Sequence, residues 1–496
     1  MTTIPASRDE LPVAVIGAGP VGLAAAAHLT DRGLPFVVIE AGDQVGAAVS
    51  EWGHIRTFTP WRYIVDPTAE KLLAPTGWAR PATPVPPTGA ELVEHYLRPL
   101  GGLFGQRLRL GHRVLAVSRA EMDKTRSIGR TERPFALRVR DAHGAVSELR
   151  ARAVVDATGT WGQPNPLGAS GLPALGEDAA EEFMVGPLPD VLGRDRSRFA
   201  GRRTLVVGAG HSAANTLLNL GRLAEQEPGT QVIWAVRGAS PAKVYGGGTA
   251  DQLPARGQLG SDLRTLVDSG TVRLLAGFSI TALEPGPQTL TVHGQSADGP
   301  LSLEGVHNVA AATGFRPDLS ILAEIQLDLH PALEAPSQLA PLIDPQYHSC
   351  GTVPPHGHRD LAHPDEGLYI VGVKSYGRAP TFLITTGNEQ VRSVVAALAG
   401  DVAAADEMQL VLPQTGVCSV NDTGEDTAAT GGCCGAPTGP QELQVPARAH
   451  RALPQGVPAL GFATGSGGGG LLAELVVAGR AGRAGRAGSS RCCTGA

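Results

Sequence analysis

Short apolar runs followed by glycine-rich turns recur between residues 11 and 400. The first run, Val13–Ile16, precedes the turn G-A-G-P-V-G, an apolar helical stretch at Ala24–Leu29 and a stop at Gly33. A second run, Phe36–Ile39, then ends in Glu40. Four-residue apolar runs bounded by turns are typical of strands buried in a parallel sheet. The pattern therefore predicts a strand, a helix and a second parallel strand in succession.

The same pattern returns in the middle of the chain. An apolar run from Thr204 precedes G-A-G-H-S-A-A-N, and the next run, Gln231–Val236, ends in Arg237. Two further runs, Ala153–Gly159 and Asn308–Gly314, each end in Ala-Thr-Gly. This internal duplication predicts two nucleotide-binding domains of related construction, in an α/β fold of the Rossmann-like, three-layer kind.

Alternating residues and turn signals predict further elements between these motifs. Thr88 and Glu91 have the spacing of a capping box, which predicts a helix through Tyr96. A turn at His143-Gly144 predicts that the strands around it form a small antiparallel meander. The predicted strands are Arg107–Ser118, Phe135–Arg140, Ala145–Val155, Val272–Gly277, Ser279–Leu283 and Gly367–Gly372, and a further helix is predicted at Asn388–Gly400.

Composition narrows the class of protein. The chain has 496 residues, enough for two or three domains, and a net charge of −6, too small to indicate nucleic acid or an anionic membrane as a partner. No apolar run reaches the roughly 18 residues that a membrane-spanning helix needs. The polar start, residues 1–11, has no signal-peptide core. We therefore expect a cytoplasmic protein that acts on a small molecule.

The spacing of Gly17, Gly19 and Gly22 has a physical reason. The first glycine permits a tight turn, the second lets the backbone approach a pyrophosphate, and the third lets helix and strand pack closely. Glu40 is placed to accept the ribose hydroxyls of an adenosine. A purely structural turn is the alternative, but strand, glycines, helix, second strand and acid in register favour a nucleotide site.

The second motif, with Gly208, Gly210 and Ala213, has an arginine where the first has its acid. An acid at this position would repel a 2′-phosphate, whereas Arg237 would attract one, so the sequence favours NADPH over NADH. The alternative is that Arg237 is a surface cation without a ligand. A helix that starts after Thr385-Thr386-Gly387 would direct its positive end at an anion bound at the sheet edge.

The segment from Trp52 to Asp66 is the most aromatic part of an aromatic-poor chain. Planar side chains interleaved with arginines are typical of the wall of a flat, anionic ligand site. The alternative is a satellite core with solvated arginines. Arg62, Tyr63 and Asp66 are the candidates for the substrate face, and no convincing acid or base is evident.

These motifs, in this order, resemble the flavoproteins with two dinucleotide-binding domains: flavin-containing monooxygenases, Baeyer–Villiger enzymes and thioredoxin reductases. The segments W-G-H-I-R-T-F-T-P-W-R-Y and D-V-L-G-R-D-R-S-R-F-A-G-R-R-T-L-V-V-G-A-G-H-S-A-A-N resemble most the flavin-dependent oxidoreductases of bacterial arsenic-resistance clusters. The resemblance implies an FAD-binding domain at residues 11–165 and 305–400, with an NAD(P)H-binding domain, 166–304, inserted in it. Residues 401–496 are predicted to be a disordered, low-complexity tail.

The resemblance also implies cofactor contacts. It places FAD against Gly17, Gly19, Gly22, Glu40, Val114, Gly372 and Asn388, and NADPH against Gly208, Gly210, Ser212, Ala213 and Arg237. The two Ala-Thr-Gly turns, Thr158-Gly159 and Thr313-Gly314, complete the predicted cofactor set. The implied activity is that of an FAD-dependent, NADPH-consuming oxidoreductase, monooxygenase-like and linked to arsenic detoxification.

Three departures keep other activities open. The histidine of the monooxygenase motif F-x-G-x-x-x-H is missing before the second fingerprint, the C-x-x-C of the reductases does not occur, and Gly372-Val373-Lys374 replaces the Gly-Asp of many relatives. An NAD(P)H oxidase or reductase that inserts no oxygen is one alternative. A non-catalytic flavin redox sensor or arsenic-binding protein is the other.

Five of the six cysteines follow residue 417. Cys418, Cys433 and Cys434 could bind trivalent arsenic or relay electrons to a disulfide, because thiolates are soft ligands and nucleophiles. An idle, solvent-exposed thiol segment is the alternative. The sequence contains no other pattern of metal ligands, and the oligomeric state cannot be read from it.

Overall fold

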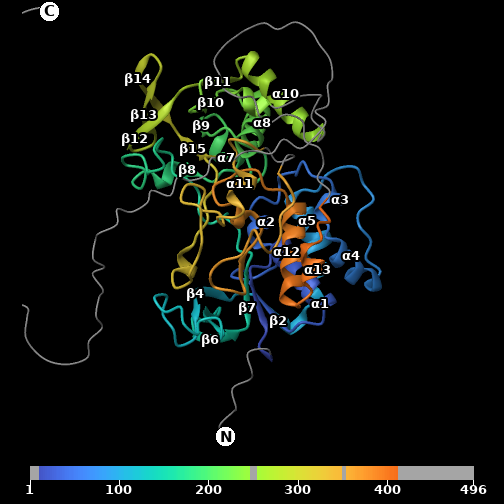
Figure 1. Cartoon of the computed structure of the whole chain (residues 1–496). Helices are drawn as coiled ribbons and strands as arrows, with labels where there is room; N and C mark the ends of the chain where they lie inside the picture. The colour runs from blue at the N-terminus through green and yellow to red at the C-terminus, as the bar shows by residue number, and fades with distance from the viewer. Residues whose placement is uncertain (1–9, 246–253, 349–352, 411–496) are drawn as a thin grey trace, which may run out of the picture. The chain divides into compact units, whose positions relative to one another are not determined.

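The computed structural model describes residues 10–245, 254–348 and 353–410 (Figure 1). They belong to one compact unit, Met1–Thr423. All six cysteines and the predicted low-complexity sequence after residue 410 lie outside the described residues. No helix among the residues described is long and apolar enough to cross a membrane.

Two five-stranded parallel sheets form the centre of the fold. The first sheet has the order β16-β7-β1-β2-β3. Its strands are β16 (Leu368–Ile370), β7 (Ala153–Asp156), β1 (Val13–Ile16), β2 (Phe36–Ile39) and β3 (Leu108–Arg109). Val15 pairs with Val38 on one side and with Val155 on the other.

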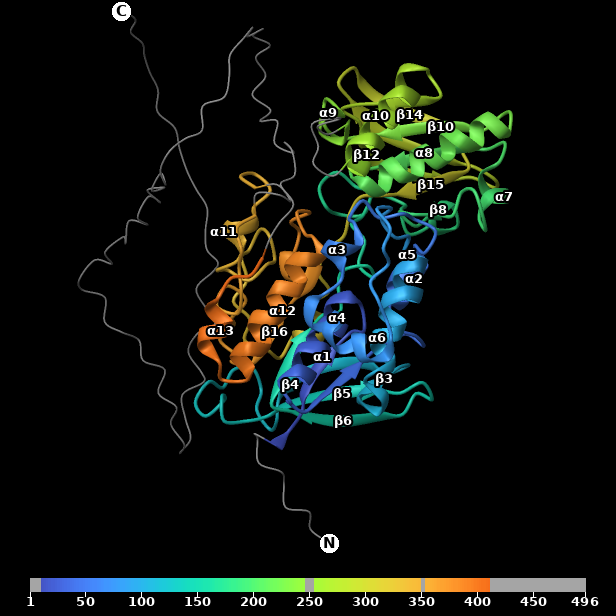
Figure 2. The same ribbon diagram turned by 90° about the vertical axis from the view of Figure 1, so that its right-hand side faces the viewer.

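Alternate residues of β1 enter two different cores. Val13 and Val15 pack in the cluster that contains helices α1 (Pro20–Asp31) and α12 (Ile384–Leu398). Ala14 and Ile16 pack in the cluster that contains β4 (Arg113–Arg119), β5 (Phe135–Arg140) and β6 (Val146–Ala151). Because successive side chains of a strand point to opposite faces, the sheet is covered by helices on one face and by an antiparallel meander on the other (Figure 2).

The second sheet repeats this three-layer construction. Its order is β11-β10-β9-β15-β8. Helices α8 (His211–Gln226) and α10 (Pro254–Asp268) lie on one face, and a second three-stranded meander packs in the core on the other. The strands are β8 (Met184–Val185), β9 (Arg203–Val207), β10 (Gln231–Ala235), β11 (Val272–Leu275) and β15 (Asn308–Ala311), and the meander is β12 (Ser279–Pro285), β13 (Leu290–Ser296) and β14 (Gly299–Val306).

Shorter helices connect these layers. They are α2 (Ala47–Glu51), α3 (Trp61–Ile64), α4 (Pro67–Leu73), α5 (Gly89–Leu92), η3 (Val93–Leu97), α6 (Arg98–Gly102), α7 (Arg196–Phe199), α9 (Ala242–Tyr245), α11 (Ala340–Ile343), η8 (Gly372–Tyr376) and α13 (Val402–Asp406), with the single turns η2 (Ala74–Thr76), η4 (Gly105–Arg107), η5 (Glu181–Phe183) and η7 (Ser320–Leu322). The predicted capping box is present at the start of α5, where the Thr88 hydroxyl accepts the Glu91 N–H and the Glu91 carboxylate accepts the Thr88 N–H.

The predicted fold class is confirmed, but several predicted boundaries are wrong. β15 pairs with β9 and β8 in the second sheet, so the boundary expected after residue 304 falls before the last strand of that sheet. The stretch Ala145–Val155 is two strands in different sheets, because Arg152 separates β6 from β7. The folded chain also continues past residue 400 into α13, whose Ala405 carbonyl accepts the Ser393 hydroxyl.

Helix α12 begins at Ile384, four residues before the predicted start. Gly387 therefore lies inside the helix, where a Cβ would be 2.6 Å from Cγ2 of Val21. The missing side chain allows α12 to pack closely on α1, and the two helices lie side by side in Figure 1. Gly387, which the sequence alone indicates is part of a turn, therefore lies where two helices pack closely.

Candidate cofactor and substrate site

The first glycine turn has the shape of a phosphate cradle. Gly17 has φ +100°, and a Cβ on Gly22 would be 2.0 Å from the Gly17 carbonyl oxygen, so neither position accepts a side chain. A Cβ on Gly19 would meet no atom within 4 Å. Gly19 is also the N-cap of α1 and has ordinary extended backbone, with φ −79°. The space at the start of the helix is therefore open, as a pyrophosphate requires.

The second glycine turn shares the strained first position and the open second position, but its third position is an alanine. Gly208 has φ +135°, and a Cβ there would be 2.0 Å from the Ala312 carbonyl oxygen. Gly210 is the N-cap of α8, and a Cβ on it would meet nothing within 4 Å. Ala213, at the position of Gly22, is buried in the core of its own sheet. The residues of both turns thus fit a dinucleotide.

Each turn is packed against the alanine of an Ala-Thr-Gly sequence. A Cβ on Gly17 would be 2.8 Å from the Ala157 carbonyl oxygen, in parallel with Gly208 and Ala312. The Ala157 N–H also donates to the Ile16 carbonyl at 2.9 Å. The two Ala-Thr-Gly motifs therefore support the glycine turns from the neighbouring strand, and this packing is the physical basis of the duplicated pattern.

Glu40 closes the first cradle. One carboxylate oxygen accepts the Ala18 N–H at 2.6 Å, and the other accepts the Gly42 N–H at 2.7 Å. Glu40 is half-buried at the carboxyl end of β2. The two hydrogen bonds fix the carboxylate beside the glycine turn, and each oxygen keeps further acceptor capacity for ribose hydroxyls.

A buried cation lies behind the first Ala-Thr-Gly turn. The Lys374 ammonium donates to Oδ2 of Asp156 at 2.7 Å and to Oγ1 of Thr158 at 3.0 Å. The Thr158 hydroxyl and N–H both donate to Oδ1 of Asp156, at 2.7 and 3.1 Å. The sequence singles out Lys374 only as a departure from Gly-Asp, and its partner Asp156 was missed. The motif D-A-T-G, with a lysine after the last strand, is the signal that could have identified the pair.

Gly372 is held by side chains rather than open to a ligand. Its N–H donates to Oε1 of Gln390 at 2.8 Å. Nε2 of the same glutamine donates to the Ser375 hydroxyl at 2.9 Å and to Nε2 of His356 at 3.0 Å. Burial lowers the pKa of His356, and Nδ1 carries the proton because it donates to the Pro354 carbonyl at 3.1 Å. This network fixes the turn after β16.

Asn388 connects α12 to the candidate substrate residues. Its side-chain amide donates to the Ile64 carbonyl at 3.2 Å. Ile64 is the last residue of α3, which carries Arg62 and Tyr63. The Arg62 guanidinium lies 4.7 Å from the centre of the Tyr63 ring, with Arg62 exposed and Tyr63 partly exposed. These two side chains remain available to a ligand.

The side chain of Asp66, by contrast, is held by contacts within the fold. Its side chain caps α4 by accepting the Ala69 N–H at 2.9 Å, and it lies 3.1 Å from Nε2 of His28. The residue is 1 % exposed, and its backbone N–H donates to the Tyr96 hydroxyl at 3.1 Å. A carboxylate so enclosed does not favour the substrate-facing role expected from the sequence.

The aromatic segment divides between core and surface. Trp61 is 4 % exposed and belongs to the first core, and Trp52 and Trp78 pack against that core. For Trp61 the expectation of a ligand wall is wrong, because the core encloses its large ring. Trp52 and Trp78 stay partly exposed. Phe58 differs, since its ring lies 4.9 Å from the ring of His211, the first residue of α8.

The other predicted contacts lie around the second cradle or on the meander. Ser212 and Ala213 are in the first turn of α8. Arg237 follows β10 and is exposed, with Nη1 donating to the Ala169 carbonyl at 3.0 Å. Val114 is on β4, and its side chain packs in the core under the first sheet. Because the Arg237 side chain is exposed, its Nε and Nη2 are accessible to a phosphate.

The two Ala-Thr-Gly turns are joined by the residues that follow them. The Asn165 N–H donates to the Gly314 carbonyl at 2.9 Å, and the Thr313 hydroxyl donates to the Asn165 carbonyl. Arg316 donates from Nε to the Asn165 side chain at 3.1 Å, and the rings of Trp161 and Phe315 lie 5.1 Å apart. We call this paired segment, residues 160–166 and 313–316, the neck.

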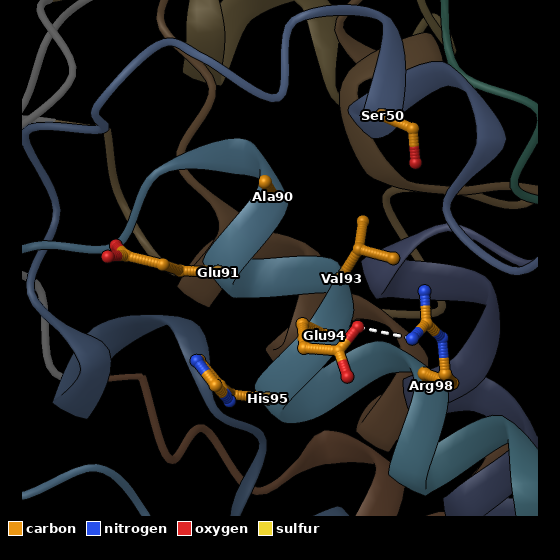
Figure 3. A pocket seen from close by; sticks show the side chains of 7 residues that line it. All are labelled: Ser50, Ala90, Glu91, Val93, Glu94, His95 and Arg98. Carbon is orange, nitrogen blue, oxygen red and sulfur yellow. Dashed lines mark hydrogen bonds and ion pairs between the residues drawn. The ribbon is translucent and has the colours of Figure 1, made fainter.

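An open hollow of about 410 Å³ lies away from these residues, along α5, η3 and α6 (Figure 3). Glu94 and Arg98, which line it one turn apart on the same helical segment, form an ion pair. None of the predicted cofactor residues lines this hollow. We therefore assign it no part in the site.

Two three-layer α/β sheets, each with a glycine turn at a helix start, define a protein with two dinucleotide-binding folds. The sequence matches the family described as pyridine nucleotide-disulphide oxidoreductase over residues 14–349, and the chain belongs to this family. The protein is accordingly a flavin-dependent oxidoreductase, of the class that uses FAD with a nicotinamide nucleotide.

A relative is similar to this chain in sequence, and solved structures are similar to it in fold. The indole-3-pyruvate monooxygenase YUCCA1 of Oryza sativa subsp. japonica is 30 % identical over 215 residues, which span 42 % of this chain and 44 % of that protein. The chain thus spans less than half the length of this relative. The bacillithiol disulfide reductase Bdr (YpdA) of Bacillus cereus has a TM-score of 0.58 at 19 % identity, with 79 % of this chain and 99 % of that chain covered.

A monooxygenase has a similar structure. DfoA, the FAD-bound cadaverine monooxygenase of the desferrioxamine pathway of Erwinia amylovora, has a TM-score of 0.56 at 14 % identity, with 82 % of this chain and 98 % of that chain covered. Reductases and monooxygenases therefore share this architecture, and the fold alone does not separate the two activities.

Proposed function

We propose that the protein is an FAD-dependent, monooxygenase-type oxidoreductase that consumes NADPH. The observation that supports the proposal is the matched pair of cradles, Gly17–Gly22 and Gly208–Ala213, each open at its helix start and each supported by an Ala-Thr-Gly turn. When bound, FAD supplies hydride acceptance and electron transfer to oxygen, chemistry that side chains cannot provide.

The first cradle would hold FAD. The open space at Gly19 admits the pyrophosphate to the positive end of α1, and the Glu40 carboxylate is fixed to accept ribose hydroxyls. The ion pair of Lys374 with Asp156 holds the Thr158-Gly159 turn at the carboxyl end of β7. These residues bind and orient the cofactor, and none of them needs to exchange a proton.

The second cradle would hold NADPH. Gly210 leaves space at the start of α8, and Arg237 follows β10 at the position where an acid would bind the ribose of NADH. A guanidinium there attracts the 2′-phosphate that distinguishes NADPH. Phe58, whose ring lies 4.9 Å from that of His211, would contact the same nucleotide from the side of the first domain.

The substrate face would be formed by Arg62 and Tyr63. Both lie on α3, which Asn388 ties to α12. A stacked guanidinium and phenol suit a small anionic or polar molecule. Trivalent arsenicals are the compounds to test first, because the segment that contains these residues resembles the oxidoreductases of arsenic-resistance clusters.

A disulfide-reductase activity is less favoured. The resemblance to thioredoxin reductases implies a C-x-x-C, and this chain has none. The six cysteines lie outside the described residues, so the thiols Cys418, Cys433 and Cys434 remain a prediction from the sequence.

Labelled oxygen separates the activities. Purified protein with NADPH, ¹⁸O₂ and methylarsenite or arsenite is expected to consume NADPH and to place the label in the product. Release of labelled peroxide with no labelled product would show an oxidase instead. A colourless protein that takes up no added FAD would contradict the proposal. The variant Gly210→Ala is the control that tests whether NADPH is consumed at the second cradle.

A further inference from the structure

A second hollow, of about 430 Å³, lies at the opposite edge of the first sheet from the glycine turns. Arg152, Ala153 and Leu368 line it where β7 and β16 begin, and Leu398 lines it where α12 ends. The cofactor turns follow the other ends of these parallel strands. The hollow is therefore separate from the proposed FAD and NADPH sites.

Arg152 has a buried edge without a partner. Nη1 donates to the Leu398 carbonyl at 3.4 Å, whereas Nε and Nη2 are both buried and have no hydrogen-bond partner. A buried donor that is left unpaired is unfavourable, and more so when the group is charged. A guanidinium in this state indicates that an acceptor belongs there.

Other arginines of this chain show which acceptor that edge takes. In four of them, Nε and Nη2 together bind both oxygens of one carboxylate. The pairs are Arg130 with Asp365, Arg359 with Asp406, Arg378 with Glu334, and Arg392 with Glu389. Parallel hydrogen bonds of this kind match carboxylate geometry. Arg152 has the same pair of donors, Nε and Nη2, but no carboxylate accepts from them.

His363 supplies a third donor in the same hollow. The residue is 6 % exposed, and its Nδ1 accepts the Asp328 N–H at 3.2 Å. Nε2 therefore carries the proton, and it is buried without a partner. Burial lowers the pKa of His363 to about 4, so the ring is neutral near pH 7 and donates a single hydrogen bond.

We propose that this hollow binds a small organic monocarboxylate, toward which the Arg152 and His363 side chains turn so that Nε and Nη2 of Arg152 and Nε2 of His363, which have almost no accessible surface in this structure, donate to it. Leu368 and Leu398 give its hydrocarbon part an apolar surface, and the volume exceeds what a simple ion needs. Glu366 also lines the hollow and is exposed. Its negative charge disfavours a dianion such as phosphate relative to a monocarboxylate.

Calorimetric titration of the FAD-loaded protein tests the proposal, with sodium benzoate, acetate and inorganic phosphate as probes at constant ionic strength. Benzoate is expected to bind saturably and more tightly than phosphate. Arg152→Leu is expected to weaken benzoate binding by about tenfold or more, because a charge-assisted pair is lost. The control Arg150→Leu removes an equal charge two residues away, from an exposed pair with Glu148, and is expected to leave binding unchanged.

Thermal unfolding without a probe separates a ligand site from a structural arginine. Arg152→Leu is expected to be at least as stable as the unsubstituted protein, since the unpaired guanidinium edge is removed. Failure of all three probes to bind would overturn the proposal, as would tighter binding of phosphate than of benzoate. Equal loss in the two variants, or a change in the flavin absorbance spectrum on adding benzoate, would overturn it as well, because the probe would then bind elsewhere.

Discussion

The Lys374 ammonium lies 2.7 Å from a carboxylate oxygen of Asp156, with both side chains almost completely buried. Asp156 ends β7, the second strand of the first sheet, and Lys374 follows its neighbour β16 at the sheet edge. The pair therefore holds the turn after the last strand against the Ala-Thr-Gly turn beside the first cradle. A charge that the sequence presents as a departure from relatives is neutralised within the fold.

Removal of one partner of this pair is expected to be costly. Lys374→Met leaves the Asp156 carboxylate buried without its cation, which lowers the free energy of unfolding by about 3–5 kcal/mol. The double variant Lys374→Met with Asp156→Asn is expected to recover part of that loss. Chemical denaturation measures both, and equal stability of the two variants would contradict the pairing. The FAD content of each purified variant reports whether the Thr158-Gly159 turn stays in place.

The two open glycines provide a matched test of the cradles. Gly19→Ala and Gly210→Ala introduce a Cβ into free space on unstrained backbone, so thermal unfolding of the cofactor-free protein should change little. Gly19→Ala is expected to weaken FAD binding by about tenfold or more. Gly210→Ala is expected to raise the KM for NADPH and to leave FAD content unchanged. If Gly19→Ala instead raised the KM for NADPH and Gly210→Ala weakened FAD binding, FAD and NADPH would occupy the opposite cradles from those proposed.

Gly22→Ala is the contrasting variant. Its Cβ would be 2.0 Å from the Gly17 carbonyl oxygen, so the strand and helix must move apart. Overpacking of this kind costs about 1–3 kcal/mol. A lower unfolding midpoint without cofactor is therefore expected, and a midpoint equal to that of Gly19→Ala would show that the turn relaxes freely.

Arg237 is expected to select between nicotinamide nucleotides. Arg237→Ala should lower kcat/KM for NADPH by about tenfold or more and leave that for NADH nearly unchanged, because only NADPH carries the 2′-phosphate. Initial rates with both nucleotides measure the ratio. Arg273→Ala, which removes a charge from exposed Arg273 on the neighbouring strand β11, is the control. An equal loss for both nucleotides would contradict the assignment.

Asp365 is expected to make the protein sensitive to acid. It is fully buried and accepts Nε of Arg119 at 2.9 Å and of Arg130 at 2.8 Å. Burial alone would raise the pKa of Asp365, but hydrogen bonds from Arg130, Gln326 and Arg119 outweigh burial and lower it. A lowered folded-state pKa stabilises the protein above the unfolded value, about 3.9, and the stabilisation is lost as the pH falls through the folded value.

Asp365→Asn tests this cluster. The variant takes the Asp365 carboxylate away from two buried guanidiniums and is expected to lose about 3–5 kcal/mol of unfolding free energy at pH 7. Its stability should also vary less with pH below 4 than that of the unsubstituted protein. Denaturation at a series of pH values measures both, and parallel pH profiles would contradict the role given to Asp365.

The sequence was informative where local chemistry decides the structure. Glycine spacing, apolar runs and the capping box at Thr88 depend on neighbours in the chain, and the structure confirms the sheets and the helix start that they predicted. The sequence was less informative for contacts between distant residues. No residue close to Asp66 in the sequence indicates that Asp66 contacts His28. Likewise, no residue close to Arg152 indicates that His363 lines the same hollow.

For some single residues the sequence allows two interpretations, and only the packing in the folded structure decides between them. Gly387 reads as a turn, but it lies inside α12 because α1 approaches there. Trp61 reads as part of a ligand wall, but the first core encloses it. In both cases a long-range contact, which no window of sequence contains, decides the outcome.

The neck has a consequence for how the chain is put together. The polypeptide leaves the first sheet near Asn165 and returns near Thr313, and these two points are hydrogen-bonded to each other. The segment between them thus starts and finishes at one place on the surface of its host. A piece whose ends already touch can be added to a protein, or exchanged for a counterpart, without breaking the host sheet. The nucleotide preference of such an enzyme can therefore change by replacement of a single continuous module.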